Sequence, residues 1–434
     1  MRFNLKKCFS VILSTGFFIA GFQPDANALG GGALGNQTTI SAKSIGHGAA
    51  FAGVADDPSA IFFNPGGLTQ SKGFQLMGGA GVLSINSEHS TPAGTKDSMA
   101  KNLPIVPYFY ASYSKDQSPW AFGLGVNSPF GLITEWKDES FSQYWATKTK
   151  LLMYIVNPTV AYAFSDKFSA GFGVDFFNVF DTELNQRIPN ATFTAPGGHA
   201  KITGDGTAWG YNLGFHWKPI DKHSFGLSYR SQVNVPIEGD VEVKDNSHPL
   251  IFGGAATYNS AVTTEFKFPQ SVLFGYGFRP NQKWTVFGDY EWVNNSATES
   301  TDFNYAQYNA SLLQSIRRDW RSTNNIGAGA EVKLNERVDF RFGGLIYERV
   351  IPSGTLEASL PDSSRFLLSL GTGIHFKDTT FDIGYSAIFF NKRTVDNSAG
   401  NPALLPFGLT SQDGTFKTMI NIFSVGVSQK FGRS

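Results

Sequence analysis

Alternation of apolar residues with small or polar ones is the most regular feature of this chain. In one example Trp120, Phe122 and Leu124 interleave with alanine and glycine. Because successive side chains on a strand point to opposite faces, such a stretch predicts a strand with one apolar face and one small or polar face. The same pattern recurs at 168–176, 209–217, 326–334, 366–376 and 381–389.

The segments between these stretches are of two kinds. Six are short and carry turn residues such as Asp, Asn, Pro and Ser, and seven are longer and polar, so thirteen connections join fourteen strands. Short turns on one side and long loops on the other are typical of outer-membrane barrels. The short segments are 114–118, 165–167, 218–223, 279–283, 333–337 and 377–379, and the long ones are about 86–104, 131–149, 185–205, 236–262, 295–321, 351–363 and 393–415.

The predicted fold class is therefore all-β, a 14-stranded antiparallel transmembrane β-barrel. Composition agrees, because aromatic residues make up 15% of the chain and charged residues only 16%, against about 25% in ordinary soluble proteins. A large soluble β-sandwich or propeller is the alternative, but no blade repeat is evident. A formal net charge of zero argues against nucleic acid as a partner.

The first 28 residues predict a secretory signal peptide. Arg2, Lys6 and Lys7 precede an apolar run at 8–22, and Ala26-Asn27-Ala28 forms a small-x-small cleavage site. The alternative is a membrane anchor helix, although the run is shorter than the ~20 residues that a spanning helix needs. Cleavage would remove the single cysteine, Cys8, so we expect neither disulfides nor cysteine metal sites in the mature chain.

Residues 29–72 do not alternate and are rich in Gly and Ala, before a first strand expected at Gly73. They could form a tail in water or a plug packed inside the barrel. We interpret 29–72 as an N-terminal hatch and 73–434 as the barrel.

The segment 44–68, SIGHGAAFAGVADDPSAIFFNPGGL, resembles the N-terminal hatch of the FadL family, outer-membrane transporters of long-chain fatty acids and aromatic hydrocarbons. The resemblance continues at 129–132, 228–231 and 361–366 and covers essentially the whole mature chain. Gly66 stands where the family usually has Ala. The hatch motif residues carried over from the family are Asp56, Asp57, Asn64, Pro65 and Gly66.

The resemblance implies a hatch inside the barrel and an inward kink in the third strand that opens a lateral gap. Ligand would enter from outside, bind in an apolar site and leave sideways into the membrane. The third strand is expected at about 119–132, and its outer part contains Asn127, Ser128, Pro129 and Gly131. Proline removes a ladder donor, so it predicts either the kink or simply the end of the strand.

Large apolar residues on the expected inner face predict a site for a hydrophobic ligand, since burying apolar surface gains ~25 cal/mol per Å². Alternatively, these residues pack against the hatch. They are Phe109, Phe177, Phe287, Leu345, Leu367 and Phe390, together with Leu273 and Ile388.

Charged residues on the same face should pair with one another, because facing lipid is costly. They are Asp175, Arg230, Asp289, Glu291, Glu331, Asp339, Arg341 and Asp382. Arg187 and Arg318, with Arg321, are expected near the strand tops, where the planar guanidinium could bind an incoming carboxylate.

No enzyme motif is present: the chain has no H-E-x-x-H and no G-x-S-x-G. We expect no cofactor and no metal. The predicted partners are a hydrophobic ligand, outer-membrane lipid and lipopolysaccharide, and the barrel-assembly machinery, with a monomer expected from the family.

The predicted function is uptake of hydrophobic molecules, foremost long-chain fatty acids, across the outer membrane. The alternatives are an aromatic hydrocarbon channel, a non-transporting structural or adhesin barrel, and a general porin. An adhesin needs neither an apolar inner wall nor a hatch, and a porin should show a polar lumen.

Overall fold

The computed structural model describes residues 37–190, 196–247, 255–307, 315–396 and 412–431. The predicted signal peptide and the first residues of the predicted hatch lie outside these ranges. Within them, no helix has both the length and the apolar character needed to cross a membrane.

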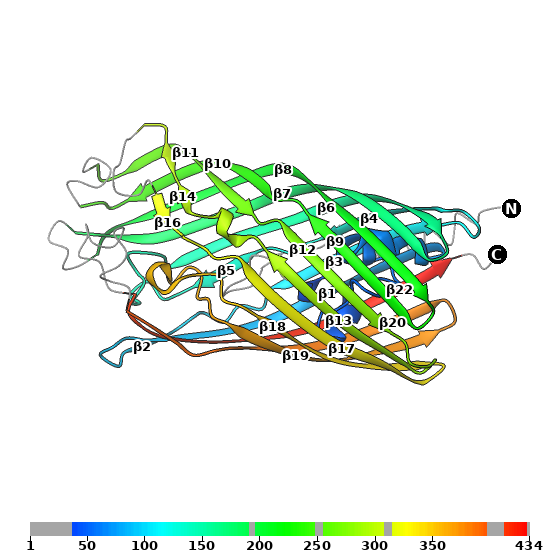
Figure 1. The fold of residues 1–434 in the computed structure, drawn as a ribbon. Coiled ribbons are helices and arrows are strands. Elements are labelled where there is room, and N and C mark those ends of the chain that lie inside the picture. Colours follow the sequence, from blue (N-terminus) through cyan, green and yellow to red (C-terminus); the bar gives the residue numbers. More distant parts are fainter. Residues whose placement is uncertain (1–36, 191–195, 248–254, 308–314, 397–411, 432–434) are drawn as a thin grey trace.

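The described chain forms a closed antiparallel barrel, as the alternation predicted (Figure 1). The last strand closes the wall on the first, with a register from Phe74↔Phe431 to Ser90↔Thr415. Fourteen wall strands are described, three of them interrupted: β1 (Gly73–Ser90), β3 (Ile105–Ser114), β4 (Trp120–Asn127) with β5 (Leu132–Glu135), β6 (Lys148–Ser165), β7 (Phe168–Pro189), β8 (Pro196–Ile220), β9 (His223–Arg230) with β10 (Val233–Lys244), β11 (Tyr258–Phe268) with β12 (Ser271–Phe278), β13 (Trp284–Val293), β17 (Thr323–Asn335), β18 (Val338–Tyr347), β19 (Arg365–Phe376), β20 (Thr379–Phe390) and β22 (Gly414–Phe431).

Several short strands and 3-10 turns lie at the end of the barrel that carries the long loops. They are β2 (Lys96–Ser98), β14 (Ser300–Asp302), β15 (Asn304–Tyr305), β16 (Ser315–Arg317), β21 (Arg393–Val395), η4 (Asn295–Ala297) and η5 (Ser353–Thr355).

The alternation sets which face of each strand meets lipid. On β8 the side chains of Trp209, Phe215 and Trp217 are exposed, whereas Asn212 and His216 between them are buried. An apolar outer band with aromatic residues near both interfaces is what a lipid environment requires of a barrel. The small and polar positions therefore face the lumen.

Short turns gather at one end of the barrel and long loops at the other, as predicted (Figure 1). The expected loop bounds were too wide, most of all in two places. Asn185↔Lys201 and Val243↔Tyr258 are paired ladder residues, so much of 185–205 and 236–262 is strand. The extension at 236–244 does alternate, but its acidic residues point outward and its Ile and Val residues point inward, so it lacks the apolar outer face of a lipid-facing strand.

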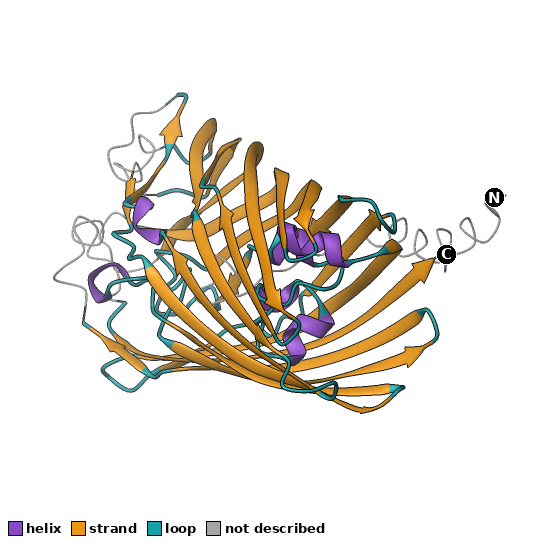
Figure 2. Ribbon diagram, turned by 45° about the vertical axis from the view of Figure 1, so that its right-hand side comes forward, coloured by secondary structure: helices purple, strands orange, loops and turns teal. Residues whose placement is uncertain are grey.

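The hatch lies inside the barrel, as Figure 2 shows, which confirms the plug interpretation of the segment before Gly73. Its described part consists of η1 (Gln37–Thr39), α2 (Ala42–Gly46), α3 (Ala60–Phe63) and η2 (Pro65–Gln70). The sequence forms only these short helices, and most of their residues are buried by the wall.

Glycines allow the hatch backbone to touch the wall backbone directly. A Cβ on Gly53 of the hatch would lie 2.5 Å from the backbone nitrogen of Tyr276, and a Cβ on Gly275 would lie 2.2 Å from the nitrogen of Gly53. Neither position has space for a side chain, which explains the glycine-rich inner face opposite a glycine-rich hatch.

Replacing Gly275 by alanine should displace the hatch, because such overpacking costs about 1–3 kcal/mol. We expect a lower melting temperature and a higher ion conductance in planar bilayers. Gly288→Ala is the matched control, since nothing lies within 4 Å of a Cβ at Gly288. Equal conductance in the two variants would contradict the close-packed interface.

Candidate functional site

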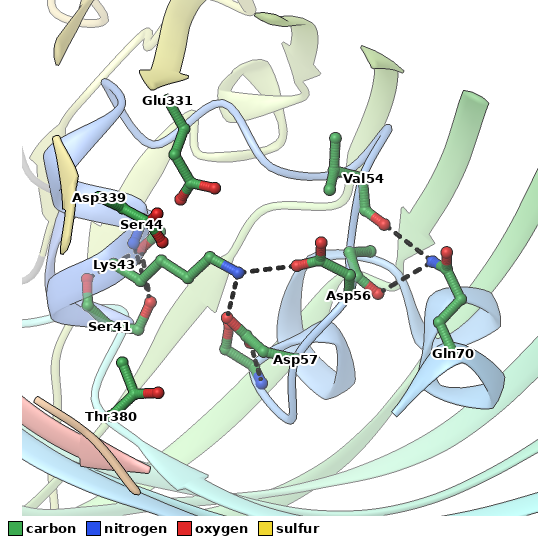
Figure 3. Close-up of polar contacts among 12 residues, drawn as sticks. Ser41, Lys43, Ser44, Val54, Asp56, Asp57, Gln70, Glu331, Asp339 and Thr380 are labelled. Carbon is green, nitrogen blue, oxygen red and sulfur yellow. Dashed lines mark hydrogen bonds and ion pairs between the residues drawn. The ribbon is translucent and has the colours of Figure 1, made fainter. Parts of the chain in front are cut away.

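The aspartate pair of the hatch motif neutralises one partly buried lysine. Lys43 Nζ lies 2.7 Å from Asp56 Oδ1 and 3.4 Å from Asp57 Oδ2 (Figure 3). Burial alone would lower the pKa of Lys43, but the two carboxylates outweigh it and raise the pKa, so the ammonium stays charged. Asp56 also reaches Arg279, 3.4 Å away, in the turn between β12 and β13. The pair thus fastens the hatch to itself and to the wall.

The Asn-Pro-Gly part of the motif fixes a second point. Asn64 Nδ2 donates to the carbonyls of Ala52 and Phe215, each at 3.0 Å, and its Oδ1 accepts from Gly66 N at 3.1 Å. Pro65 begins η2, where a missing N–H costs nothing. These residues hold the hatch in place and line neither of the cavities described below.

One carboxylate and one guanidinium of the wall bind hatch backbone. Asp289 Oδ2 accepts from Phe51 N at 2.8 Å and Ala52 N at 3.0 Å. Arg230 pairs with Asp175 and also donates to the carbonyl of Phe62 at 3.2 Å. The inward charges therefore connect wall and hatch.

A second group of inward charges lies around Arg341, which is 1% exposed. Its guanidinium lies 2.7 Å from Glu331, 2.5 Å from Asp382 and 3.7 Å from Asp339. His375 completes the group at 2.6 Å from Asp339. Six of the eight inward charges predicted from the sequence therefore form ion pairs, whereas Asp289 binds backbone amides and Glu291 accepts from the side-chain amides of Gln37 and Asn325.

His47 of the hatch packs against Phe287, one of the predicted ligand-binding residues. The rings of His47 and Phe287 stack with centroids 4.2 Å apart. Burial lowers the pKa of His47 to about 3, so the ring is neutral at ordinary pH. Phe287 therefore packs against the hatch, the alternative considered for the inner apolar residues.

One cavity, here called the inner cavity, is bounded by the hatch, by the interruption of the third strand and by the strands β9, β12, β13, β17, β18 and β19. Its apolar lining combines Phe62 and Phe63 of α3 with Pro129 and Phe130 of the strand interruption and Leu273 of β12. Its polar lining includes Gln37, Arg230, Glu291, Asn325 and Arg365.

A second cavity, here called the outer cavity, lies between the long loops and the adjoining parts of the strands. Its apolar lining includes Leu132, Leu184, Ile202, Ile237, Val262, Phe266, Phe268, Phe303, Trp145 and Trp320. Cationic side chains at this cavity are Lys150, Lys267 and Arg318. An apolar groove with a few charged groups is suited to an amphiphile.

The third strand is interrupted beside the inner cavity. β4 ends at Asn127 and β5 resumes at Leu132, and both pair with β6. The four residues 128–131 stand opposite only three residues, 152–154, of β6. On the other side, β3 pairs with β4 only from Phe109 onward, so its residues 105–108 are paired with β1 alone. The wall has an unpaired edge at this point.

The family model of outer membrane protein transport proteins, described as OMPP1/FadL/TodX, matches residues 28–431. This chain belongs to that family. It is therefore an outer-membrane transport protein, and the family is one of transporters, in agreement with the absence of enzyme motifs in the sequence.

Relatives at low identity span nearly the whole chain. A putative outer membrane protein of Neisseria meningitidis serogroup B is 24% identical over 88% of this chain and 89% of its own length. The long-chain fatty acid transport protein of Escherichia coli K12 is 23% identical over 79% of this chain and 85% of its own length.

Solved structures share the fold. A Pseudomonas aeruginosa FadL homologue superposes with a TM-score of 0.80 at 17% identity, over 93% of this chain and 100% of that one. The Pseudomonas putida toluene transporter TodX superposes with a TM-score of 0.69 at 18% identity, over 90% of this chain and 100% of that one.

Most of the predicted ligand-binding residues of this family member lie elsewhere than at the two cavities. Phe177 is buried beside Phe130, and Leu345 and Leu367 belong to a buried cluster that also contains Ile45 of the hatch. Phe390 lies under the Arg365 guanidinium, 5.0 Å from its ring centre. None of them lines the inner or the outer cavity.

Phe109 was assigned to the wrong face. It is partly exposed between buried Tyr108 and Tyr110, so it lies on the outer parity of β3. Because residues 108–110 are all aromatic, the sequence does not show which of them face inward. The hydrogen bonds of Tyr108 and Tyr110 to the hatch show that these two do. The Tyr108 hydroxyl accepts from Ala42 N at 2.9 Å, and the Tyr110 hydroxyl donates to the Ile40 carbonyl at 3.3 Å.

The two arginines proposed for a carboxylate differ in position. Arg318 lines the outer cavity, where it pairs with Glu357 and donates to Thr301 Oγ1 at 3.1 Å. Arg187 lines neither cavity and reaches the carbonyl of Asp138 at 3.5 Å.

Sequence reasoning missed the rings that form the cavity walls, Phe62, Phe63, Phe130 and Phe268, and it missed Lys43. Pro269 was the available signal for Phe268, since a proline inside an alternating run marks a break in the strand. In the described residues no group of three His, Cys, Asp or Glu is placed to hold a metal ion.

Asp289→Ala should increase the mobility of the hatch backbone at Phe51 and Ala52, which the carboxylate now binds. Two buried N–H groups lose their acceptor, at about 1–3 kcal/mol each. We expect faster hydrogen exchange at Phe51 and Ala52, measured by mass spectrometry. Asp289→Asn keeps one acceptor oxygen and should exchange at an intermediate rate. Unchanged exchange in both variants would show that Asp289 does not hold the hatch.

Proposed function

We propose that this transporter takes up long-chain fatty acids, binding them in the apolar lumen and releasing them sideways at the interruption of the third strand. The observation that carries the proposal is the position of Pro129 and Phe130. They line the inner cavity and also lie within 128–131, where the wall lacks its ladder. A ligand in this cavity is therefore adjacent to the unpaired edge of β3.

The hatch supports a sideways route over an axial one. Its glycines contact wall glycines, and its lysine, asparagine and backbone amides are bonded on several sides. A molecule that continued along the barrel axis would have to break these contacts, whereas a sideways step at residues 128–131 breaks no strand pairing.

The outer cavity supports an elongated amphiphile as first ligand. Its lining runs from Leu132 at the third strand to Phe303 and Trp320 in the loops, with Arg318 and Lys150 among its polar groups. An acyl chain can lie along such a lining while its carboxylate meets a cation. Several relatives are named long-chain fatty acid transport proteins.

Aromatic hydrocarbons are the second candidate ligand. The solved structures with this fold include toluene transporters, and neither cavity requires a charged ligand. The partners predicted with the function belong to the same proposal: lipopolysaccharide and lipid around the barrel, the assembly machinery at Phe431 of the last strand, and a monomeric state.

Titration of the detergent-solubilised protein with a long-chain fatty acid, with toluene in parallel, tests the ligand class. We expect saturable quenching or enhancement of tryptophan fluorescence, because Trp145 and Trp320 line the outer cavity. Binding of toluene alone would assign hydrocarbon uptake, and binding of neither ligand would refute transport of both classes.

Arg318→Ala should weaken fatty-acid binding about tenfold, the loss expected for one charge-assisted hydrogen bond. Toluene binding to the same variant should not change, which controls for damage to the cavity. Arg187→Ala is the matched arginine control, since Arg187 lines neither cavity. Equal fatty-acid affinities for both variants would remove Arg318 from the site.

Blocking the strand interruption should stop release but not binding. Ser128→Cys, modified with a bulky maleimide, places an obstacle within residues 128–131 in a mature chain predicted to have no other cysteine. Release is followed as transfer of a protein-bound fluorescent fatty acid to vesicles that carry a lipid-attached quencher. Ala170→Cys on the outer face of β7 is the control. Undiminished transfer from modified Ser128→Cys would refute lateral exit at this place.

A further inference from the structure

The two cavities meet at a cluster of three phenylalanine rings. Phe130 lines the inner cavity and Phe268 lines the outer one, and their ring centroids are 4.9 Å apart. Phe177 completes the triangle at 5.4 Å from Phe268 and 6.2 Å from Phe130. These rings lie where a ligand would pass from one cavity to the other.

The cluster is closed in this structure. Phe130 is 7% exposed, and Phe177 and Phe268 are each 1% exposed. Rings this close and this buried exclude a third group between them, because protein interiors are packed to near-crystal density. The rings therefore separate the two cavities at this point, and an acyl chain passes between Phe130 and Phe268 only after a ring has moved.

Two of the three rings are attached where the backbone ladder is broken. Phe130 belongs to the unpaired residues 128–131. Phe268 is the last residue of β11, directly before Pro269 and the break that precedes β12. Phe177, by contrast, is in the middle of β7 and is paired with Ile155 on one side and Ala208 on the other.

We propose that Phe130 and Phe268 form a movable partition between the cavities, with Phe177 as its fixed base, and that this partition controls the passage of acyl chains to the lateral exit. The inference rests on the proposed function. The partition favours thin, flexible chains, because a chain can slide between two rings that tilt, whereas a rigid bulky ligand needs both rings displaced.

Two dye-labelled proteins can time the arrival of ligand on each side. Thr264 lines the outer cavity and Ser271 the inner one, so Thr264→Cys and Ser271→Cys are each labelled with the same small environment-sensitive dye. The labelled proteins are mixed with a C16 fatty acid in a stopped-flow instrument. In the otherwise unchanged protein we expect the outer signal first and the inner signal after a lag.

Phe130→Ala and Phe268→Ala should each shorten the lag about tenfold, the factor that corresponds to one lost aromatic pair contact. In Phe130→Ala the outer signal should keep its rate, because Phe130 does not line the outer cavity. Ile155→Ala is the control, because Ile155 belongs to the same buried cluster but lines neither cavity, and its lag should not change. Heat-modifiable electrophoretic migration verifies that every variant is folded.

The outcomes separate the two proposals. If neither dye responds to the fatty acid, the proposed function fails. If both dyes respond but without a lag, or with a lag that Phe130→Ala and Phe268→Ala leave unchanged, the partition is refuted while ligand binding stands.

Discussion

The pairing of backbone polar groups is the constraint on which this structure depends. Lipid offers no hydrogen bonds, so every strand needs partners on both edges, and the pairing of β22 with β1 closes the ring. Against this requirement the interruption at residues 128–131 is costly, because β3 keeps an edge without a neighbour. The interruption lies where the hatch, the inner cavity and the third strand come together. This position is a reason to regard the break as part of the transport machinery.

Closure leaves a lumen that must be filled without blocking the route of the ligand. Glycine on both surfaces allows hatch and wall backbones to touch, and the wall carboxylates then satisfy amides that a helix would have satisfied itself. The part of the lumen around the hatch is therefore tightly packed, while the remaining part keeps its cavities. The charges around Arg341 and Lys43 are almost all paired within this filling, and these pairs hold the hatch and the wall together.

Strand count, hatch and inward charges could be predicted from the sequence because each follows from alternation or from the cost of exposing charge to lipid. The individual cavity residues could not. Phe109 and Tyr110 are both aromatic, and only the hydroxyl contact with Ile40 decides which faces inward. Phe130 and Phe268 lie at interruptions, where the two-residue period is lost, so parity says nothing about them. Phe287 faces inward as predicted, but a buried histidine of the hatch, not a ligand, covers it.

The length of β7 and β8 has a further consequence. With 25 residues, β8 is ~80 Å long at about 3.3 Å per residue, whereas the apolar band of such barrels is only about 25 Å tall. Even a strongly tilted strand then projects well beyond the outer leaflet. The wall therefore continues beyond the apolar band on the side of the long loops, and the outer cavity lies in this extended part. A hydrophobic molecule can thus meet an apolar surface before it reaches the level of the lipid.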